Sequence, residues 1–319
     1  MLEVKDLSIA FDSMEGTTQI LNKVHFSLKK GEIVGIVGES GSGKSVTALS
    51  ILGLLDENAK ICEGSIVYKD KHILSLKSKE LQALRGKEIG MVFQEPMTAL
   101  HPTMKIGRQL AEVIKRHRHL PMKEANQLAI QALDAVHIHQ PEKVARQYPF
   151  ELSGGMRQRV VIALAMASPP ELLLADEPTT ALDVTIQNEI LKLFQELNQK
   201  KGVSIILITH DLGVVSQICE RTFVMYAGEI IESGPTSEIL NHPNHPYTRA
   251  LLDALPENKD PGYPLNAIQG EVTDLKHRPK GCCFASRCMY RMAICEQRQP
   301  EPEEIQAGHH SSCWMGRND

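Results

Sequence analysis

Apolar residues along the first 235 positions follow two patterns that predict strands. Residues 2–11 and 20–28 alternate between apolar and polar side chains, as half-buried strands do. Uninterrupted apolar runs with the length of buried strands lie at residues 32–37, 89–93, 171–175 and 203–209. These patterns therefore predict several strands, most of which are buried on both faces of a sheet.

Helical patterns separate these strands. The first predicted helix, at residues 44–55, follows the apolar run at 32–37 after a glycine-rich turn. Residues 183–200 carry one apolar face, and Asp183 precedes that face as a suitable N-cap. The face consists of Ile186, Ile190, Phe194 and Leu197. Strands that alternate with helices in this way are typical of a mainly parallel α/β fold.

The alternation stops in two places. Between about residues 96 and 152 the strand pattern is missing, and two helices are expected at 103–119 and 122–137. After Gly234-Pro235 prolines are frequent, and only residues 246–255 read clearly as a helix. Residues 256–319 look rich in loops. The small hydrophobic core that they can form needs additional cross-links, such as a bound metal or disulfides. We therefore expect a domain at 1–235, with a helical subdomain at about 96–152, and a C-terminal extension at 236–319.

The glycine-rich turn carries the strongest chemical signal in the chain. Its residues, Gly38-Glu39-Ser40-Gly41-Ser42-Gly43-Lys44-Ser45, match the phosphate-binding loop G-x-x-x-x-G-K-[ST]. Glycines let backbone N–H groups turn toward phosphate oxygens, and the following helix directs the positive end of its dipole at them. In such a loop Lys44 reaches the β and γ phosphates and Ser45 holds Mg²⁺. We expect ATP to contact residues 38–46, the last of which is Val46.

An acidic pair predicts hydrolysis as well as binding. Asp176 and Glu177 follow directly on the apolar residues 172–175, and the carboxyl end of a strand is where an open α/β sheet binds ligands. Asp176 is suited to coordinate Mg²⁺ through water, and Glu177 to polarise the attacking water as general base. Alone, such a pair could equally cap a helix. Together with the phosphate-binding loop it indicates a nucleotide hydrolase.

Composition excludes several classes of protein. The chain has 319 residues, of which 42% are hydrophobic and 23% charged, as in an ordinary globular protein. Its 35 basic and 39 acidic residues give a net charge of −4, and the one dense basic run, 115–119, is expected to be a solvated helix face. No apolar stretch reaches the ~18–20 residues of a membrane span. The charged first residues do not form a signal peptide, so we expect a cytoplasmic chain. Because the net charge is mildly acidic, we expect no binding of nucleic acid.

The segment Leu152-Ser153-Gly154-Gly155-Met156 resembles the L-S-G-G-Q signature of ATP-binding-cassette (ABC) ATPases, with Met156 in place of the glutamine. A hydroxyl and glycine amides at a helix N-terminus suit an anion. In that family the signature faces the γ-phosphate held by a partner subunit. The resemblance therefore assigns Ser153, Gly154 and Gly155 to ATP bound in trans.

Other landmarks occur in the order of the same family. Gln94 is similar to the Q-loop glutamine, which senses Mg²⁺ and contacts membrane subunits, and 181–183 resembles the D-loop. His210 is similar to the switch histidine at the γ-phosphate. Phe11 is a candidate for the aromatic residue that stacks on adenine. A buried aromatic side chain of a strand is an equally good interpretation of Phe11. The resemblance covers 1–235 and implies an ABC ATPase core with a RecA-like sheet, an antiparallel β region and a helical signature subdomain.

The resemblance also implies the role of each residue at the site. The catalytic residues are Glu177, His210 and Lys44. The Mg²⁺ ligands are Ser45, Gln94 and Asp176.

Three further segments are similar to one branch of importers, those for dipeptides, oligopeptides and nickel. Residues 245–252 begin with His245-Pro246-Tyr247, the H-P-Y motif of that branch. Residues 94–100 and 153–159 also resemble this branch. Residues 100–102 differ from it, because His101 stands where an asparagine is usual.

Five of the seven cysteines lie beyond residue 281, and four of them resemble the C-terminal cysteine motif of this branch, whose members can carry a [4Fe–4S] cluster. These four are Cys282, Cys288, Cys295 and Cys313. Four thiolates bind either such a cluster or Zn²⁺, and the wide gaps favour iron–sulfur over zinc. Cys283 is a possible substitute for Cys282. Four unligated thiols are the remaining alternative.

The expected function is that of an ATPase subunit of a peptide importer, at the cytoplasmic face of the cell membrane. The implied partners are a second, related ATPase in a heterodimer, two transmembrane permease subunits and an extracytoplasmic substrate-binding protein. Nickel or metallophore cargo is one alternative, and an exporter is a weaker one. A soluble ABC ATPase of DNA repair or translation is another, although the chain lacks the coiled coils and zinc insertions usual there. A redox-sensing role for the cluster is compatible with transport.

Overall fold

The computed structural model describes residues 1–254, 268–315 and 317. The chain divides into two compact units. Unit 1 consists of Met1–Lys29, Ile33–Ser75 and Thr209–Asp319, and unit 2 consists of Lys30–Glu32 and Leu76–Ile208. Each unit therefore combines segments that are distant in sequence.

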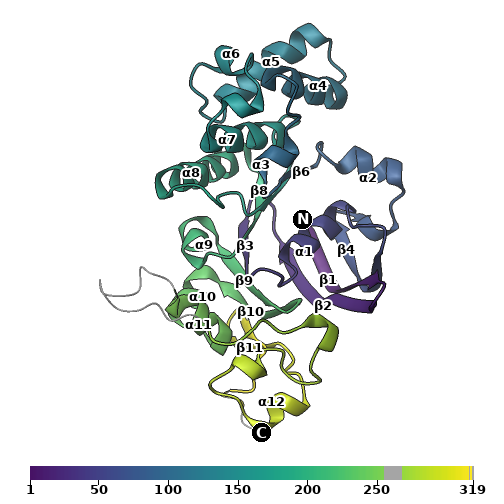
Figure 1. Cartoon of the computed structure of the whole chain (residues 1–319), viewed down its shortest axis with the longest axis vertical. Helices are drawn as coiled ribbons and strands as arrows, with labels where there is room; N and C mark the ends of the chain where they lie inside the picture. The colour runs from purple at the N-terminus through teal and green to yellow at the C-terminus, as the bar shows by residue number, and fades with distance from the viewer. Residues whose placement is uncertain (255–267, 316, 318–319) are drawn as a thin grey trace. The chain divides into compact units, whose positions relative to one another are not determined.

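Unit 1 contains an antiparallel sheet with the strand order β2-β1-β4-β5 (Figure 1). Its strands are β1 (Leu2–Ser13), β2 (Gly16–Leu28), β4 (Ala59–Tyr68) and β5 (Lys71–His72), followed by the 3-10 turn η1 (Ile73–Ser75). In β2, Val24, Phe26 and Leu28 are buried and alternate with exposed residues, as predicted. In β1 the predicted alternation holds only at residues 2–4, because residues 7–10 are all buried. The antiparallel β region expected from the family resemblance is thus present.

The phosphate-binding loop connects β3 (Ile33–Val37) to α1 (Lys44–Leu52). All five residues of β3 are buried, as the apolar run predicted. The helix was predicted to extend to residue 55 and ends three residues earlier. Gly53 adopts the left-handed conformation (φ 60°), and its N–H bonds back to the carbonyls of Leu49 and Ser50, which closes the helix.

A second group of strands in unit 1 carries the C-terminal part of the chain. β3 pairs in parallel with β9 (Arg221–Tyr226), and β9 pairs with the antiparallel strand β10 (Glu229–Pro235). Ala227 and Gly228 connect β9 to β10 with φ values of 47° and 82°, as a tight hairpin turn requires. β10 then pairs with β12 (His309–Ser311), and β12 with β11 (Glu303–Gln306). The sequence pattern predicted loops where β11 and β12 lie, so that expectation is wrong for these residues.

Helices complete unit 1 around these strands. They are α9 (Leu212–Ile218), α10 (Thr236–Asn241), α11 (Pro246–Asp253) and α12 (Ala293–Gln297), with 3-10 turns η4 (Leu275–His277) and η5 (Ala285–Arg287). α11 is the helix predicted at 246–255, and residue 255 lies outside the described residues.

Unit 2 contains the parallel strands β6 (Ile89–Val92), β7 (Leu172–Asp176) and β8 (Ser204–Thr209), with β7 in the middle. Its helices are α2 (Ser78–Leu84), α3 (Pro96–Ala99), α4 (Ile106–Arg118), α5 (Met122–Asp134), α6 (Pro141–Val144), α7 (Gly154–Ala165) and α8 (Val184–Lys201), with the 3-10 turn η2 (Pro149–Glu151). Residues 96–152 are helical without a strand, and the two predicted helices there are α4 and α5.

Local sequence signals account for the ends of α8. The Asp183 carboxylate accepts the N–H of Ile186 at 3.0 Å, so Asp183 is the predicted N-cap. Gly202, in the left-handed conformation, ends the helix. Across the described residues, no helix is both long and apolar enough to span a lipid bilayer.

A buried carboxylate joins three segments of unit 1. The Glu232 side chain in β10 is 0% exposed, and it accepts the N–H groups of Asn244 (2.6 Å) and His245 (2.9 Å). It also contacts the Nε2 atom of His309 in β12 at 2.8 Å. These contacts fix the start of α11 and the outer strands against β10.

We expect Glu232→Ala to lower the free energy of unfolding by about 3–5 kcal/mol, because it leaves buried donors without their acceptor. Denaturant unfolding of the full chain measures this. The control is Glu304→Ala in β11, an exposed carboxylate that accepts one N–H, from Gly308, and should cost less than about 1 kcal/mol. Equal effects of the two substitutions would contradict the anchoring role of Glu232.

Candidate functional site

The phosphate-binding loop encloses the amine of its own lysine. Lys44 is 5% exposed, and its Nζ donates to the carbonyl oxygens of Gly38 (2.8 Å) and Glu39 (3.0 Å). The N–H of Ser42 also donates to the Glu39 carbonyl, at 3.2 Å. The positive charge is therefore already placed within the loop, where a phosphate group can share it.

Two glycines in this loop allow close contact with the β9–β10 hairpin. A Cβ atom on Gly38 would lie 2.1 Å from the carbonyl oxygen of Met225, so only glycine fits. Gly43 has φ 100°, a conformation that favours glycine. The N–H of Gly228 donates to the carbonyl of Ser42 at 2.9 Å. The hairpin thus supports the loop from outside.

The other predicted ATP contacts in unit 1 differ in exposure. Ser40, Gly41 and Ser45 are exposed, and Val46 is half-buried in the first turn of α1. His210 is exposed and directly follows β8. Phe11 is half-buried near the end of β1, where it pairs with Thr18 and Ala59, so it is not a fully buried strand aromatic.

In unit 2 the predicted general base is held by the predicted Q-loop residue. The Oε2 atom of Glu177 accepts a hydrogen bond from the Gln94 amide (3.1 Å) and another from the hydroxyl of Thr180 (2.9 Å). Glu177 has φ 45°, which is strained for a residue with a side chain, and its N–H donates to the Ile208 carbonyl at 2.8 Å. Asp176, at the end of β7, is 6% exposed. No sequence motif indicates the contribution of Thr180.

The residues of the signature segment form the N-terminus of α7. Ser153 caps this helix by accepting the N–H of Met156 at 3.4 Å. Ser153 and Gly154 are exposed, whereas Gly155 lies against Ile186 of α8, whose Cγ2 atom would be 2.7 Å from an added Cβ. Ser153 and Gly154 are therefore accessible at this helix end, and the anion site expected there stays a prediction.

The four predicted cysteine ligands line one small cavity of about 20 Å³. Cys282, Cys288, Cys295 and Cys313 share its wall with His245 and Trp314. Burial raises the pKa of Cys282 to about 12. In the parts of the chain that the structure describes, no three His, Cys, Asp or Glu side chains are arranged to hold a metal ion.

His245, which lines this cavity, carries a buried hydrogen-bond donor. Burial lowers its pKa to about 3, so the ring is neutral, and its Nδ1 accepts the N–H of Tyr247 at 3.1 Å. The ring proton therefore lies on Nε2. This atom is buried and has no hydrogen-bond partner within the described residues.

Two further residues near the loop carry no nucleotide motif. Arg287 forms an ion pair with the carboxylate of Glu39, and the hydroxyl of Tyr247 accepts the N–H of Glu39. In the sequence, Tyr247 stands out only as part of the H-P-Y motif. Arg287 directly precedes Cys288, and that position is the only signal the sequence offered.

A lysine amine enclosed by a glycine-rich loop between a buried strand and a helix, and an acidic pair after a parallel strand, define a P-loop nucleotide hydrolase. Comparison with known proteins narrows the class. Residues 21–180 match the family profile described as ABC transporter, and residues 231–295 match the profile described as Oligopeptide/dipeptide transporter, C-terminal region.

Full-length relatives agree with these matches. The chain is 47% identical over 316 residues to the dipeptide transport ATP-binding protein DppD of Bacillus subtilis (strain 168), covering 99% of this chain and 94% of that protein. It is 48% identical over 317 residues to the oligopeptide transport ATP-binding protein OppD of the same organism, covering 99% and 88%. The dimeric bacterial ABC transporter cassette MJ0796 has a TM-score of 0.66 at 32% identity, over 74% of this chain and 99% of that one.

The chain belongs to the ABC transporter family. The family resemblance and the ABC ATPase fold predicted from the sequence are therefore confirmed, and ATPase activity follows from membership of this class.

Proposed function

We propose that the chain hydrolyses ATP to power the import of peptides, as a peripheral subunit at the cytoplasmic face of the membrane. The observation that carries this proposal is the union, in one chain, of the nucleotide motifs with a C-terminal region of the oligopeptide and dipeptide type. The names of DppD and OppD support peptides over nickel or metallophores. The same names disfavour a soluble ABC ATPase of DNA repair or translation.

In this proposal each predicted site residue acts on the bound ATP. Lys44 and the N–H groups of the loop bind the phosphates, and Glu177 polarises the attacking water. Because the Gln94 amide nitrogen donates to Glu177, the Gln94 amide oxygen stays available to a cation. His210 contacts the γ-phosphate and Phe11 stacks on adenine.

Mg²⁺ fits the proposed ligands. The hydroxyl of Ser45, the amide oxygen of Gln94 and the carboxylate of Asp176 are the hard oxygen donors that this ion prefers. When bound, Mg²⁺ neutralises charge that develops on the phosphates.

We further propose that the site is completed by a partner ATPase. The exposure of Ser153 and Gly154 at the N-terminus of α7 supports contact with a nucleotide held by another chain. The MJ0796 cassette is dimeric in a post-hydrolysis state with ADP and phosphate, which also supports this arrangement. A second, related subunit is the proposed partner, so the pair is a heterodimer.

The remaining partners belong to the transporter. We propose two transmembrane permease subunits, contacted by the helices at about 96–152, and an extracytoplasmic substrate-binding protein. The proposed functional division of the chain is an ATPase domain at 1–235 and an extension at 236–319.

We propose a [4Fe–4S] cluster at Cys282, Cys288, Cys295 and Cys313. The buried Nε2 donor of His245 fits this group, because sulfur atoms of a cluster accept hydrogen bonds. Zinc is the alternative, and the wide spacing of the four cysteines along the sequence favours the cluster over it. When bound, a cluster supplies a covalent cross-link and a one-electron redox centre.

The first test is purification of the tagged full chain from its native membranes in mild detergent, with mass spectrometry of what accompanies it. We expect two multi-span membrane proteins and a related ATPase. Recovery with ribosomes or DNA-repair factors would contradict the importer. Recovery of a homodimer with permeases would contradict only the heterodimer.

Glu177→Gln should bind ATP within about twofold of the wild-type affinity and lower turnover by about 10²–10⁴-fold, because a glutamine cannot accept the proton from water. Binding and steady-state hydrolysis are measured on the same preparation. Glu57→Gln, at an exposed loop position, should match the wild type. Turnover near the wild-type rate in Glu177→Gln would show that another group is the base.

Protein purified without oxygen should contain about four iron and four sulfide per chain. Cys288→Ser should lose most of both, together with the visible absorbance, whereas Cys62→Ser, at an exposed cysteine in β4, should keep them. Zinc without sulfide, or metal-free wild-type protein, would contradict the cluster.

A further inference from the structure

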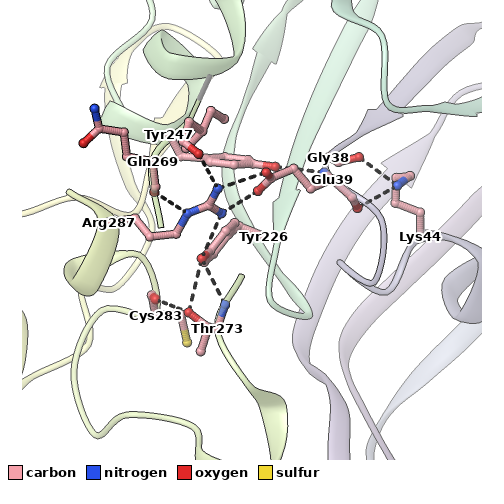
Figure 2. Close-up of polar contacts among 10 residues, drawn as sticks. Gly38, Glu39, Lys44, Tyr226, Tyr247, Gln269, Thr273, Cys283 and Arg287 are labelled. Atoms are coloured by element: carbon pink, nitrogen blue, oxygen red, sulfur yellow. Dashed lines mark hydrogen bonds and ion pairs between the residues drawn. The ribbon is translucent and has the colours of Figure 1, made fainter. Parts of the chain in front are cut away.

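Glu39, the second residue of the phosphate-binding loop, is held by the C-terminal part of unit 1. Its carboxylate forms a two-point ion pair with Arg287, at 2.6 Å from Nη1 to Oε2 and 3.0 Å from Nη2 to Oε1 (Figure 2). The two residues are 248 positions apart in the sequence. A bidentate arginine–carboxylate pair fixes orientation as well as distance.

Arg287 has little freedom to move. Its side chain is 3% exposed, and its Nε donates to the carbonyl of Gln269 at 3.1 Å. The guanidinium lies 5.8 Å from the ring centroid of Tyr226 and 5.9 Å from that of Phe284. The hydrogen bond to Glu39 is the main cause that raises the pKa of Arg287. The loop therefore faces a fixed, buried positive charge.

Tyr247 holds the backbone of the same residue. The N–H of Glu39 donates to the Tyr247 hydroxyl oxygen at 2.9 Å, as Figure 2 shows. The Tyr247 ring is fully buried and packs against Tyr226 and Phe284, with centroid distances of 4.7 and 5.4 Å. Both the side chain and the amide of Glu39 are thus fixed from outside the loop.

These contacts resolve an electrostatic conflict within the loop. ATP brings several negative charges to residues 38–46, and the Glu39 carboxylate belongs to the same loop. Like charges at short range repel strongly where water is partly excluded. The guanidinium of Arg287 compensates the charge of the Glu39 carboxylate. The Tyr247 hydroxyl accepts the N–H of Glu39 and so restrains the backbone at this residue.

We propose that Arg287 and Tyr247 are positioning residues of the nucleotide site. They act through Glu39: together they hold the beginning of the phosphate-binding loop in the shape that receives ATP, and Arg287 neutralises its carboxylate. This inference rests on the proposed ATPase function and extends it, because it makes the C-terminal extension a part of the ATP site. The extension then contributes to ATP affinity even in the absence of the membrane subunits.

The test measures ATP affinity, KM and kcat on the purified full chain, with Mg-ATP as ligand. Arg287→Gln should raise both Kd and KM for ATP about tenfold or more, with kcat changed less than about twofold. The matched control is Arg291→Gln, at an exposed arginine in the same segment that pairs with Glu296 (3.3 Å). This control should equal the wild type.

A double substitution separates charge compensation from general support of the fold. In Glu39→Gln/Arg287→Gln the uncompensated carboxylate is gone, so most of the lost affinity should return. If Arg287 only stabilises the fold, the double variant should bind no better than Arg287→Gln, and the active fraction should fall while KM stays unchanged. Either of those results would overturn the proposal.

Tyr247→Phe removes one oxygen atom and keeps the packed ring, so it serves if Arg287→Gln fails to fold. It should raise Kd for ATP roughly threefold, measured well below the melting temperature of the variant so that all of the protein is folded. Unchanged affinity in both Arg287→Gln and Tyr247→Phe overturns the inference and leaves the ATPase function intact. A wild-type chain that does not bind ATP would overturn the function itself.

Arg287 directly precedes Cys288, so iron content is measured on the same samples. Iron equal to the wild type in Arg287→Gln, with weaker ATP binding, supports the direct route through Glu39. If the loss of affinity occurs only in samples that have lost iron, and Tyr247→Phe binds normally, the proposal is wrong.

Discussion

A loop that binds phosphate through its backbone must keep most of its N–H groups available to the ligand, so its shape has to be maintained largely by neighbours. In this chain those neighbours come from the β9–β10 hairpin and from the residues beyond it. Gly38 lies so close to the Met225 carbonyl that no side chain fits, and Gly228 donates to Ser42. Lys44 contributes from inside by bonding the carbonyls of Gly38 and Glu39. Much of unit 1 can be understood as the support that such a loop requires.

Two buried carboxylates attach the C-terminal residues to this support. Glu232 collects N–H donors from the start of α11 and meets His309 of β12. Glu229 contacts Arg278 at 2.5 Å and Asn22 at 2.6 Å, and burial raises its pKa. Both residues lie on β10, the strand that follows the hairpin turn. The hairpin therefore supports the phosphate-binding loop through β9 and the turn, and its second strand, β10, fixes the extension.

Local chemistry explains what could be predicted from the sequence. The phosphate-binding loop, the cap at Asp183 and the buried strands are encoded within a few residues, so their elements were found, with an error of three residues at the end of α1. The strands β11 and β12 were missed because their residues carry little apolar pattern. β12 forms by pairing with the distant β10, and β11 forms by pairing with β12. The contact between Glu39 and Arg287 was equally inaccessible, since nothing in either segment specifies its partner.

The ring cluster of Tyr226, Tyr247 and Phe284 limits how this chain can be taken apart. A fragment of residues 1–235 would contain every nucleotide motif, yet it would lack two of these rings and leave Tyr226, now fully buried, in water. Motif boundaries therefore do not mark a place where the chain can be cut. In unit 1 the nucleotide motifs and the extension are thus joined by one buried cluster of rings.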